Sequence, residues 1–399
     1  MLNKYIKFKN NFNITAKHKK NIIVKKQFEK LKKDYLRKNI PLLSTFNKNY
    51  KLNYTKNFIK KLKKNNHFNL VGMGGSALGA KSIYSFLKHK IKKNFYFIDD
   101  LNEENIEIIN KKKQKEINIY ISKSGNTIET LVNLNLISNK NKTSSNIIIT
   151  ETKKNNLLEI SNKLKSEIIE HKNYIGGRYS VMSEVGMLPA ELMGLKINDF
   201  KQLNHLILNK NFINNLITNV SWIYNLYVKK KTNSIILNYD PEMYNFCLWY
   251  QQLVAESLGK KNKGILPIIS NMPKDNHSLL QCYLDGPKNS FFTIFISKHR
   301  KNFKLNNLLL AENMKFLSDK NLETITNAQR NATEKIFSKK KIPFRSFHIL
   351  KKTEKELGFM FTFFVLETIL LSRMLKVNPF DQPSVELVKN STRNILKNI

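Results

Sequence analysis

The sequence predicts an α/β protein built from two α/β/α sandwiches with parallel sheets. Short apolar runs alternate with amphipathic helical segments along most of the chain, and the pattern restarts after a helical stretch that ends near residue 200. In the first half, apolar runs lead into loops rich in glycine, serine and threonine. Strands that alternate with helices form parallel sheets covered by helices on both faces, so these observations favour this fold class over all-α or all-β folds.

The expected order of elements follows from these apolar runs. Strands are expected at residues 68–73, 94–100, 117–123, 146–152, 233–240, 290–297 and 342–350. The expected divisions are an N-terminal helical extension at 1–44, a first sandwich at 45–200, a second sandwich at 201–376 and a C-terminal segment at 377–399. A long helix is expected after Pro241, a residue that suits the first turn of a helix.

Composition narrows the class of protein. The chain has 399 residues, enough for two domains with sizeable cores, and its 41% apolar content excludes a disordered chain. The formal net charge is +39, but the lysines are scattered from end to end among many Asn and Ile residues, as A- and T-rich codons would produce. We therefore expect no nucleic-acid partner, although a positive field favours a phosphorylated substrate.

Cysteine content and hydropathy indicate where the protein works. Cys247 and Cys282 are too few for a disulfide framework and suggest a reducing compartment. The N-terminus lacks the apolar core of a signal peptide. The most apolar stretch, which starts at Gly358, carries Glu367 and Arg373 and so predicts a buried helix. We expect a cytoplasmic protein with no membrane partner.

The loop at residues 72–79, GMGGSALG, follows the first expected strand. Its glycines allow close approach of an anion, and the helix that follows offers free N–H groups. It is not a P-loop, because Ala80 stands where a P-loop requires lysine. It does match a dinucleotide fingerprint, with Asp99 near the end of the next strand, so an NAD-dependent dehydrogenase is one alternative.

A second loop, SKSGNT at residues 122–127, follows another strand and opens another helix. Three hydroxyls and a lysine at one helix N-terminus suit a phosphomonoester. The simpler interpretation is a capped helix, in which Asn126 and Glu129 form a capping pair. Two such loops on neighbouring strands favour a phosphate ligand over a nicotinamide cofactor.

Further blocks carry candidate catalytic side chains. Arg178 follows two glycines, which free the backbone to aim its guanidinium into a cleft. Gln252 and Glu256 are four residues apart on an aromatic-rich helix and share a face. A partly buried carboxylate beside a positive site can act as a base, although Glu256 could instead pair with Lys260. His277, in a loop, is a potential proton carrier.

The last block, residues 378–389, reads NPFDQPSVELVK and predicts a C-terminal helix with proline near its start. Taken singly, this block and the preceding ones also fit solvated loops and helix ends. Together, the six blocks GMGGSALG, SKSGNTIET, GGRYSVMSEVGMLPA, QQLVAESLGK, DNHSLLQ and NPFDQPSVELVK resemble the phosphoglucose isomerase family, in that family's order. The resemblance runs from about Leu70 to Lys389 and is strongest to the compact bacterial form. Val388 departs from it, because the family usually has glycine there.

The resemblance implies two sugar-isomerase-type (SIS) α/β/α sandwiches and reversible conversion of glucose 6-phosphate to fructose 6-phosphate, in glycolysis and gluconeogenesis. It implies neither cofactor nor metal. It further implies that the substrate and its phosphate are held by residues of the two loops, of the glutamine-bearing helix and of the C-terminal block. These residues are Gly75, Ser76, Ser122, Lys123, Ser124, Thr127, Gln252 and Gln382.

The resemblance also implies the catalytic roles. Glu256 moves the proton from C2 to C1 through a cis-enediolate, and Arg178 stabilises the charge on the enediolate oxygens. His277 and Lys389 assist ring opening. The family is dimeric and the counterpart of His277 comes from the partner subunit, so we expect a homodimer whose lone monomer is inactive.

Two other classes remain as alternatives beside the dehydrogenase. A regulatory module that only binds sugar phosphates would need the phosphate loops but not Glu256, Arg178 and Lys389, so the presence of all three argues against it. A nucleic-acid binder rests on charge alone, and binding to arbitrary DNA with steep salt dependence would support it. Additional activity on mannose 6-phosphate stays open.

Overall fold

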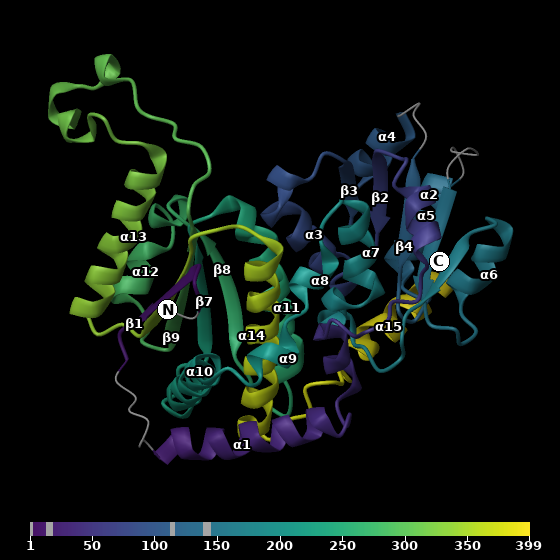
Figure 1. Ribbon diagram of the computed structural model, residues 1–399, viewed down its shortest axis with the longest axis horizontal. Coiled ribbons are helices and arrows are strands. Elements are labelled where there is room, and N and C mark those ends of the chain that lie inside the picture. Colours follow the sequence, from purple (N-terminus) through teal and green to yellow (C-terminus); the bar gives the residue numbers. More distant parts are fainter. Residues whose placement is uncertain (1–2, 13–18, 112–115, 139–144) are drawn as a thin grey trace.

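Two five-stranded sheets lie side by side in the computed structural model, with helices between and around them (Figure 1). The structure describes residues 3–12, 19–111, 116–138 and 145–399. This arrangement confirms the α/β class with parallel sheets. We propose that the boundary expected near residue 200 divides the chain between the two sheets.

The first sheet is entirely parallel and has the order β3-β2-β4-β5-β6. Its strands are β2 (His67–Val71), β3 (Asn94–Ile98), β4 (Ile117–Ile121), β5 (Ser145–Thr150) and β6 (Glu167–Glu170). All five residues of β4 are buried, as expected of a central strand covered on both faces. The sequence analysis missed β6, whose four residues EIIE carry charges at both ends and half of which are exposed.

The second sheet has the order β1-β10-β9-β7-β8. Its strands are β1 (Ile6–Asn10), β7 (Asn233–Asn238), β8 (Leu266–Asn271), β9 (Ser290–Ser297) and β10 (Phe344–Ile349). The four later strands are parallel, and β1 adds to β10 antiparallel. The N-terminal segment is therefore more than a helical extension, because its strand covers the edge of the second sheet.

Four helices fill the space between the sheets: α3 (Gly75–Phe86), α7 (Glu184–Leu192), α11 (Tyr244–Leu258) and α14 (Glu354–Leu375). Helix α3 packs against α7 and α11, and α11 packs against α14 (Figure 1). One buried apolar cluster contains side chains from both sheets, such as Phe68 and Phe295. The two sheets therefore share a core, which fixes the ends of α3 and α11 relative to each other.

Helix α14 contains the apolar stretch that the sequence analysis singled out. Among the described residues it is the one helix long and apolar enough to cross a membrane, but 89% of that stretch is buried inside the protein. This confirms the prediction of a buried core helix.

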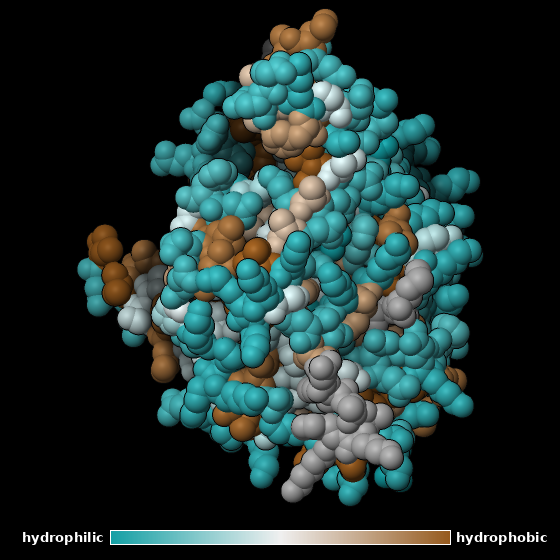
Figure 2. Space-filling view, turned by 90° about the vertical axis from the view of Figure 1, so that its left-hand side faces the viewer, coloured by the Kyte–Doolittle hydropathy of each residue, from teal (hydrophilic) through white to brown (hydrophobic). Residues whose placement is uncertain are grey.

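The other helices cover the outer faces. They are α1 (Lys19–Leu36), α2 (Lys56–Leu62), α4 (Glu103–Lys111), α5 (Ile128–Ser138), α6 (Asn156–Lys163), α8 (Ile197–Phe200), α9 (Leu203–Leu206), α10 (Lys210–Val228), α12 (Leu280–Asp285), α13 (Leu322–Lys339) and α15 (Val385–Lys397). Figure 2 shows one outer face covered mostly by hydrophilic side chains, with hydrophobic ones in separate patches. This agrees with a positive charge that is spread over a solvated surface.

Both sheets follow the same chain path. In the first, the chain leaves β2 for β3 on one side and then crosses to β4 on the other; in the second, it leaves β7 for β8 and then crosses to β9. The connections after β2 and β4 thus run in opposite directions, and so do those after β7 and β9. Such a switch point opens a crevice at the carboxyl ends of the strands, where α/β proteins bind ligands.

Candidate active site

The loops after β2 and β4 lie side by side at the switch point of the first sheet. A Cβ atom added to Gly72 would lie 2.9 Å from the carbonyl oxygen of Ile121, the last residue of β4. The first loop then turns through Gly74, whose φ of +53° lies in the left-handed region that favours glycine. Helix α3 starts directly after this turn, so the two loops predicted from the sequence meet at one edge.

A close backbone crossing joins the first loop to the block that carries Arg178. A Cβ atom on Gly75 would lie 2.2 Å from the carbonyl carbon of Gly177, a distance that no side chain can occupy. A Cβ on Gly74 would lie 2.9 Å from Nε2 of Gln252 on α11. The glycines therefore let three blocks that are far apart in the sequence converge at one point.

Arg178 lies at the centre of this convergence and is 2% exposed. Its Nε donates to Oγ of Ser257 at 2.9 Å, and one Nη donates to Oε2 of Glu256 at 3.0 Å and to Oε1 of Gln382 at 2.9 Å. The other Nη donates to the carbonyl oxygens of Pro379 and Asp381. The planar guanidinium is thus fixed in orientation, with one edge turned to the carboxylate of Glu256.

Glu256 is held between two donors near the end of α11. Its Oε1 accepts a hydrogen bond from Nε2 of Gln252 at 2.7 Å, and its Oε2 faces Arg178. The shared helix face of Gln252 and Glu256 is as the sequence predicted. The Glu256 side chain is 28% exposed, so the carboxylate is oriented by the protein but open to a ligand.

The C-terminal segment 378–382 is clamped against this cluster. Lys260, which the sequence left as a possible partner of Glu256, instead lies 2.8 Å from Oδ1 of Asp381 and donates to the carbonyl oxygen of Asn378. Its ammonium holds the pKa of Asp381 below the usual range. The Tyr179 ring packs against that of Phe380, 5.8 Å between centroids. These contacts bring Gln382 to Arg178, whereas the resemblance led us to expect it at the phosphate.

The SKSGNT loop forms a compact turn at the start of α5. Oγ of the buried Ser122 lies 2.8 Å from Oγ1 of Thr127, and Oγ of Ser124 accepts from the backbone N of Asn126 at 3.3 Å. Gly125 has a φ of +64°. A Cβ there would lie 1.9 Å from Oδ1 of Asn155, so only glycine fits.

Two side chains of this loop make contacts that the sequence did not predict. Nζ of Lys123 donates to the carbonyl oxygen of Asn173 at 2.6 Å and lies 3.5 Å from Glu151, so it is turned toward the neighbouring loop. Oδ1 of Asn126 accepts from the backbone N of Asn156 at 3.1 Å. The Asn126 side chain thus bonds the first turn of α6, whose N-cap residue is Asn155, instead of capping its own helix with Glu129 as expected.

His277 and Lys389 are both exposed side chains. His277 is exposed and follows the short 3₁₀ helix Lys274–Asn276, beyond β8. Lys389 is on α15, where its Nζ lies 2.7 Å from Oε1 of Glu386. Every residue of α15 is exposed. None of the hydrogen bonds or ion pairs among described residues joins either side chain to Glu256 or Arg178.

Sequence reasoning missed several residues that hold the cluster. Ser257 bonds Arg178 and also lies 2.8 Å from the hydroxyl of the buried Tyr179. Lys260 binds the C-terminal segment. The signal for Ser257 was its place beside Glu256 in the sequence, but adjacency alone does not reveal a contact with a residue 79 positions away.

The structure argues against the dehydrogenase alternative, which requires an acidic residue near the end of the next strand to bind a ribose. Nζ of Lys81 lies 2.8 Å from Oδ2 and 2.9 Å from Oδ1 of Asp99, so an ion pair occupies the carboxylate that would bind a ribose. Among the described residues, no group of three or more His, Cys, Asp or Glu side chains is placed to hold a metal ion.

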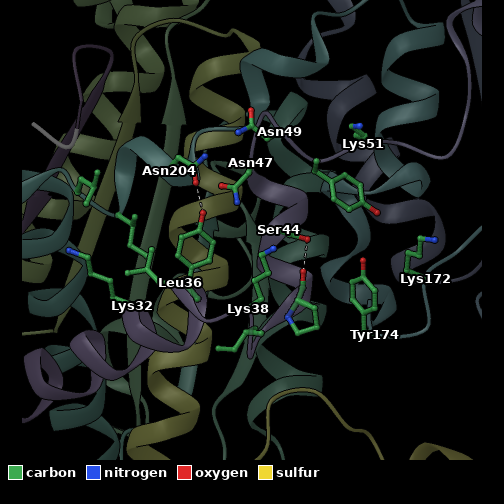
Figure 3. A pocket seen from close by; sticks show the side chains of 16 residues that line it. Lys32, Leu36, Lys38, Ser44, Asn47, Asn49, Lys51, Lys172, Tyr174 and Asn204 are labelled. Carbon is green, nitrogen blue, oxygen red and sulfur yellow. Dashed lines mark hydrogen bonds between the residues drawn. The ribbon is translucent and has the colours of Figure 1, made fainter.

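A broad cavity of about 950 Å³ lies elsewhere, beside the end of α1 (Figure 3). In it the Tyr35 hydroxyl donates to Oδ1 of Asn204, and Oγ of Ser44 donates to the carbonyl oxygen of Pro41. None of the candidate catalytic or phosphate-binding residues lines it. Cavity size therefore does not locate the site that the motifs and contacts define.

The chain is similar in sequence to known proteins of one family. Residues 33–267 match the model of the family described as phosphoglucose isomerase. The chain is 31% identical to the glucose-6-phosphate isomerase of Methanocaldococcus jannaschii over 362 residues, which cover 86% of this chain and 88% of that protein. It is 31% identical to the Mycoplasmopsis synoviae glucose-6-phosphate isomerase, covering 81% of this chain and 80% of that one.

Solved structures share the fold. A Thermus thermophilus protein of hypothetical function superposes with a TM-score of 0.80 at 20% identity, over 94% of this chain and 96% of that one. A glucose-6-phosphate isomerase from Chlamydia trachomatis superposes with a TM-score of 0.69 at 19% identity, over 86% and 72%. The family match and the curated relatives show that this chain belongs to the phosphoglucose isomerase family.

Proposed function

We propose that the cluster around Glu256 and Arg178 carries out the family's reaction, the reversible conversion of glucose 6-phosphate to fructose 6-phosphate. The chain is an aldose–ketose isomerase, and its reaction is a step of glycolysis and gluconeogenesis. The observation that carries the proposal is a carboxylate held by two donors, Gln252 and Arg178, beside the switch point of the first sheet.

Glu256 is the proton-transfer base. Isomerisation requires one group to take the proton from C2 and return it to C1, with a cis-enediolate between the two steps. A carboxylate with one oxygen on Gln252 and the other on Arg178 has a fixed direction, and its partial exposure leaves room for a substrate carbon.

Arg178 stabilises the enediolate. The Nη that bonds Glu256 also bonds Oε1 of Gln382, so it points to the open side of the cluster, while Ser257 and two backbone carbonyls hold the rest of the guanidinium. A substrate oxygen can replace the Gln382 contact without moving the arginine. A charge already in place when the oxyanion develops is the kind of stabilisation that contributes most to catalysis.

The phosphate group binds between the two loops at the switch point. The hydroxyls of Ser122, Ser124 and Thr127 lie around the start of α5, and Ser76 is on the first turn of α3. Both helices direct the positive ends of their dipoles to this edge of the sheet. Lys123, although turned to Asn173, adds positive charge nearby.

The full site needs a homodimer. His277 is exposed and makes no hydrogen bond or ion pair with the cluster among the described residues, which fits a residue that acts in the site of a second copy. Lys389 lies seven residues beyond Gln382, and the intervening residues are all exposed, so α15 has room to bring it to the sugar ring. Both would serve ring opening. The cytoplasmic address expected from the sequence remains a prediction.

A coupled assay tests the function. Purified protein with glucose 6-phosphate, EDTA and an enzyme that consumes fructose 6-phosphate should show turnover at the rates usual for enzymes, about 1–10³ s⁻¹. A preparation held monomeric by dilution should lose that activity. No turnover by a folded, dimeric preparation would reject the proposed function.

A further inference from the structure

A basic cavity, separate from the one in Figure 3, lies at the carboxyl ends of strands in the second sheet. It has a volume of about 470 Å³, within the range of roughly 300–1,000 Å³ that small-molecule sites occupy. Its lining comes from the turn after α3 and from the residues that follow β9 and β10. No carboxylate is among the residues that line it. The positively charged residues that line the cavity are Lys90, Lys298, Arg300, Lys351 and Lys352.

The cavity lies beside the switch point of the second sheet. Residues 298–300 follow β9 as residues 122–124 follow β4, and β9 and β4 hold the same place in the two sheets. Ligands bind in the crevice at such a point because the connections diverge there. The fold thus repeats, in the second sheet, the position that we assign to phosphate in the first.

Carboxylates behind the cavity balance only part of its charge. Lys352 is 9% exposed, and its Nζ lies 2.6 Å from Oδ2 of Asp240; Arg300 lies 2.7 Å from Oε1 of Glu242. Lys90 pairs with Glu354 in the same way. These three carboxylates face five cations, so a positive excess remains.

Two exposed lysines, Lys298 and Lys351, carry the excess positive charge. Within the described chain, neither Lys298 nor Lys351 has a carboxylate oxygen within 4 Å; the Lys351 ammonium lies 5.3 Å from the centre of the Tyr5 ring. A positive field is also felt by His89, which lines the cavity. Burial first, and then the charge of Arg300, lower the pKa of His89 below its usual value.

We propose that this cavity binds a small phosphate-bearing molecule, whose phosphoryl group is held by Lys298, Arg300 and Lys351. A phosphomonoester dianion matches the charge excess, and ammonium and guanidinium groups are its usual partners in proteins. The cavity's volume of about 470 Å³ suits a small molecule.

This site is distinct from the proposed active site. Helix α11 begins just after Asp240 and Glu242, which bind the cavity's cations, and reaches Glu256 near its other end. Its 15 residues span about 22 Å at 1.5 Å per residue. Two ligands can therefore be bound at the same time.

Histidine NMR locates the ligand directly. The pKa of His89 is measured in inorganic phosphate and in chloride at equal ionic strength, with the His89 signal assigned by its loss in His89→Gln. A dianion within about 4–6 Å favours the protonated imidazole, so we expect phosphate to raise the pKa by about 0.5 or more. The concentration dependence of this change gives the apparent Kd.

Matched variants separate the site from general charge effects. Lys298→Gln with Lys351→Gln should weaken the apparent Kd at least about tenfold, whereas Lys335→Gln with Lys339→Gln, on the exposed face of α13, should leave it unchanged. Ser124→Ala should also leave it unchanged, which keeps this site separate from the proposed phosphate loop. No phosphate response of His89 in the wild type, or an equal response in the Lys298/Lys351 variant, would overturn the proposal.

Discussion

Replacing Arg178 by lysine keeps the positive charge and removes the planar fork, so it tests whether geometry or charge matters at this position. The guanidinium serves five acceptor atoms, on Glu256, Ser257, Gln382 and the backbone of residues 379 and 381. An ammonium has three donors, so at least two of these acceptors lose a charged partner.

The magnitude follows from those two contacts. A hydrogen bond to a charged group contributes about 1.5–3 kcal/mol, which gives about 3–6 kcal/mol for two. Water can reach part of the site, since the Glu256 side chain is 28% exposed, so the lower end of this range applies. A loss of about 3 kcal/mol corresponds to a decrease of about 10² in rate.

The assay is the coupled isomerase reaction at several substrate concentrations. If Arg178 acts mainly in the transition state, kcat and kcat/KM should fall together by about 10² while KM changes little. Arg37→Lys, the same chemical change at an exposed position just after α1, should leave all three near the wild-type values. The reasoning is refuted if Arg178→Lys keeps kcat within about threefold of the wild type.

Three further predictions address the phosphate loop, the backbone crossing and acid stability. Ser124→Ala removes one donor to a charged group, and kcat/KM for glucose 6-phosphate should fall about 10- to 100-fold. Gly75→Ala places a methyl group 2.2 Å from the carbonyl carbon of Gly177, and overpacking of about 1–3 kcal/mol or more should lower Tm measurably. Burial lowers the pKa of His171 from 6.5 to about 4, so between these pH values the unfolded chain binds a proton that the folded chain does not. The free energy of unfolding should therefore fall by up to about 3 kcal/mol as the pH drops from about 6.5 to 4. In chemical denaturation, His171→Gln should make this loss less steep.

Each of these has a matched comparison. Ser338→Ala, on the exposed side of α13, should not change kcat/KM, and an equal loss in both serine variants would contradict the phosphate role. In Gly176→Ala the added Cβ lies 3.5 Å from its nearest atom, which is an ordinary contact. If this variant has a Tm as low as that of Gly75→Ala, the close backbone crossing is not the cause of the destabilisation. An unchanged acid slope in His171→Gln would show that other groups cause the loss.

The strands that sequence reasoning found and missed differ in burial. The run INIYI of β4 is buried throughout, so its apolar signal is continuous. Strand β8 is an edge strand, its first residue Leu266 is 58% exposed and its second is Pro267, a residue that argues against a strand. Strand β1 alternates Ile6 and Phe8 with lysines, but five residues among many lysines give little signal until β10 offers an edge.

Prediction of the site from the sequence was limited in a similar way. Motifs identified the residue types at Glu256, Arg178 and Gln252, because the chemistry demands them. Their mutual contacts depend on the crossing of Gly75 with Gly177, which joins segments about 100 positions apart and leaves no local pattern in the sequence. Hydrogen bonds of exposed polar side chains could not be predicted from the sequence either. The bond from the backbone N of Asn156 to Oδ1 of Asn126 is an example.

The contact between Gln382 and Arg178 is a further example. The resemblance implied a role for Gln382 at the phosphate, which stays a prediction, whereas its hydrogen bond to Arg178 was not predicted. The ion pair between Lys260 and Asp381, which holds the same segment, joins two blocks that the sequence analysis had quoted without linking them. Such contacts between distant, singly charged side chains require the folded chain.

The most direct test of the central claim is the exchange of the C2 proton by Glu256→Gln. This variant keeps the size of the side chain and loses the base, so release of a tritium label from C2 of glucose 6-phosphate should fall by at least about 10³ relative to the wild type, within the range for loss of a general base. Binding of a sugar-phosphate inhibitor should persist, and Glu312→Gln, an exposed control, should release the label at the normal rate. Near-normal release from Glu256→Gln would contradict the account and place the base elsewhere.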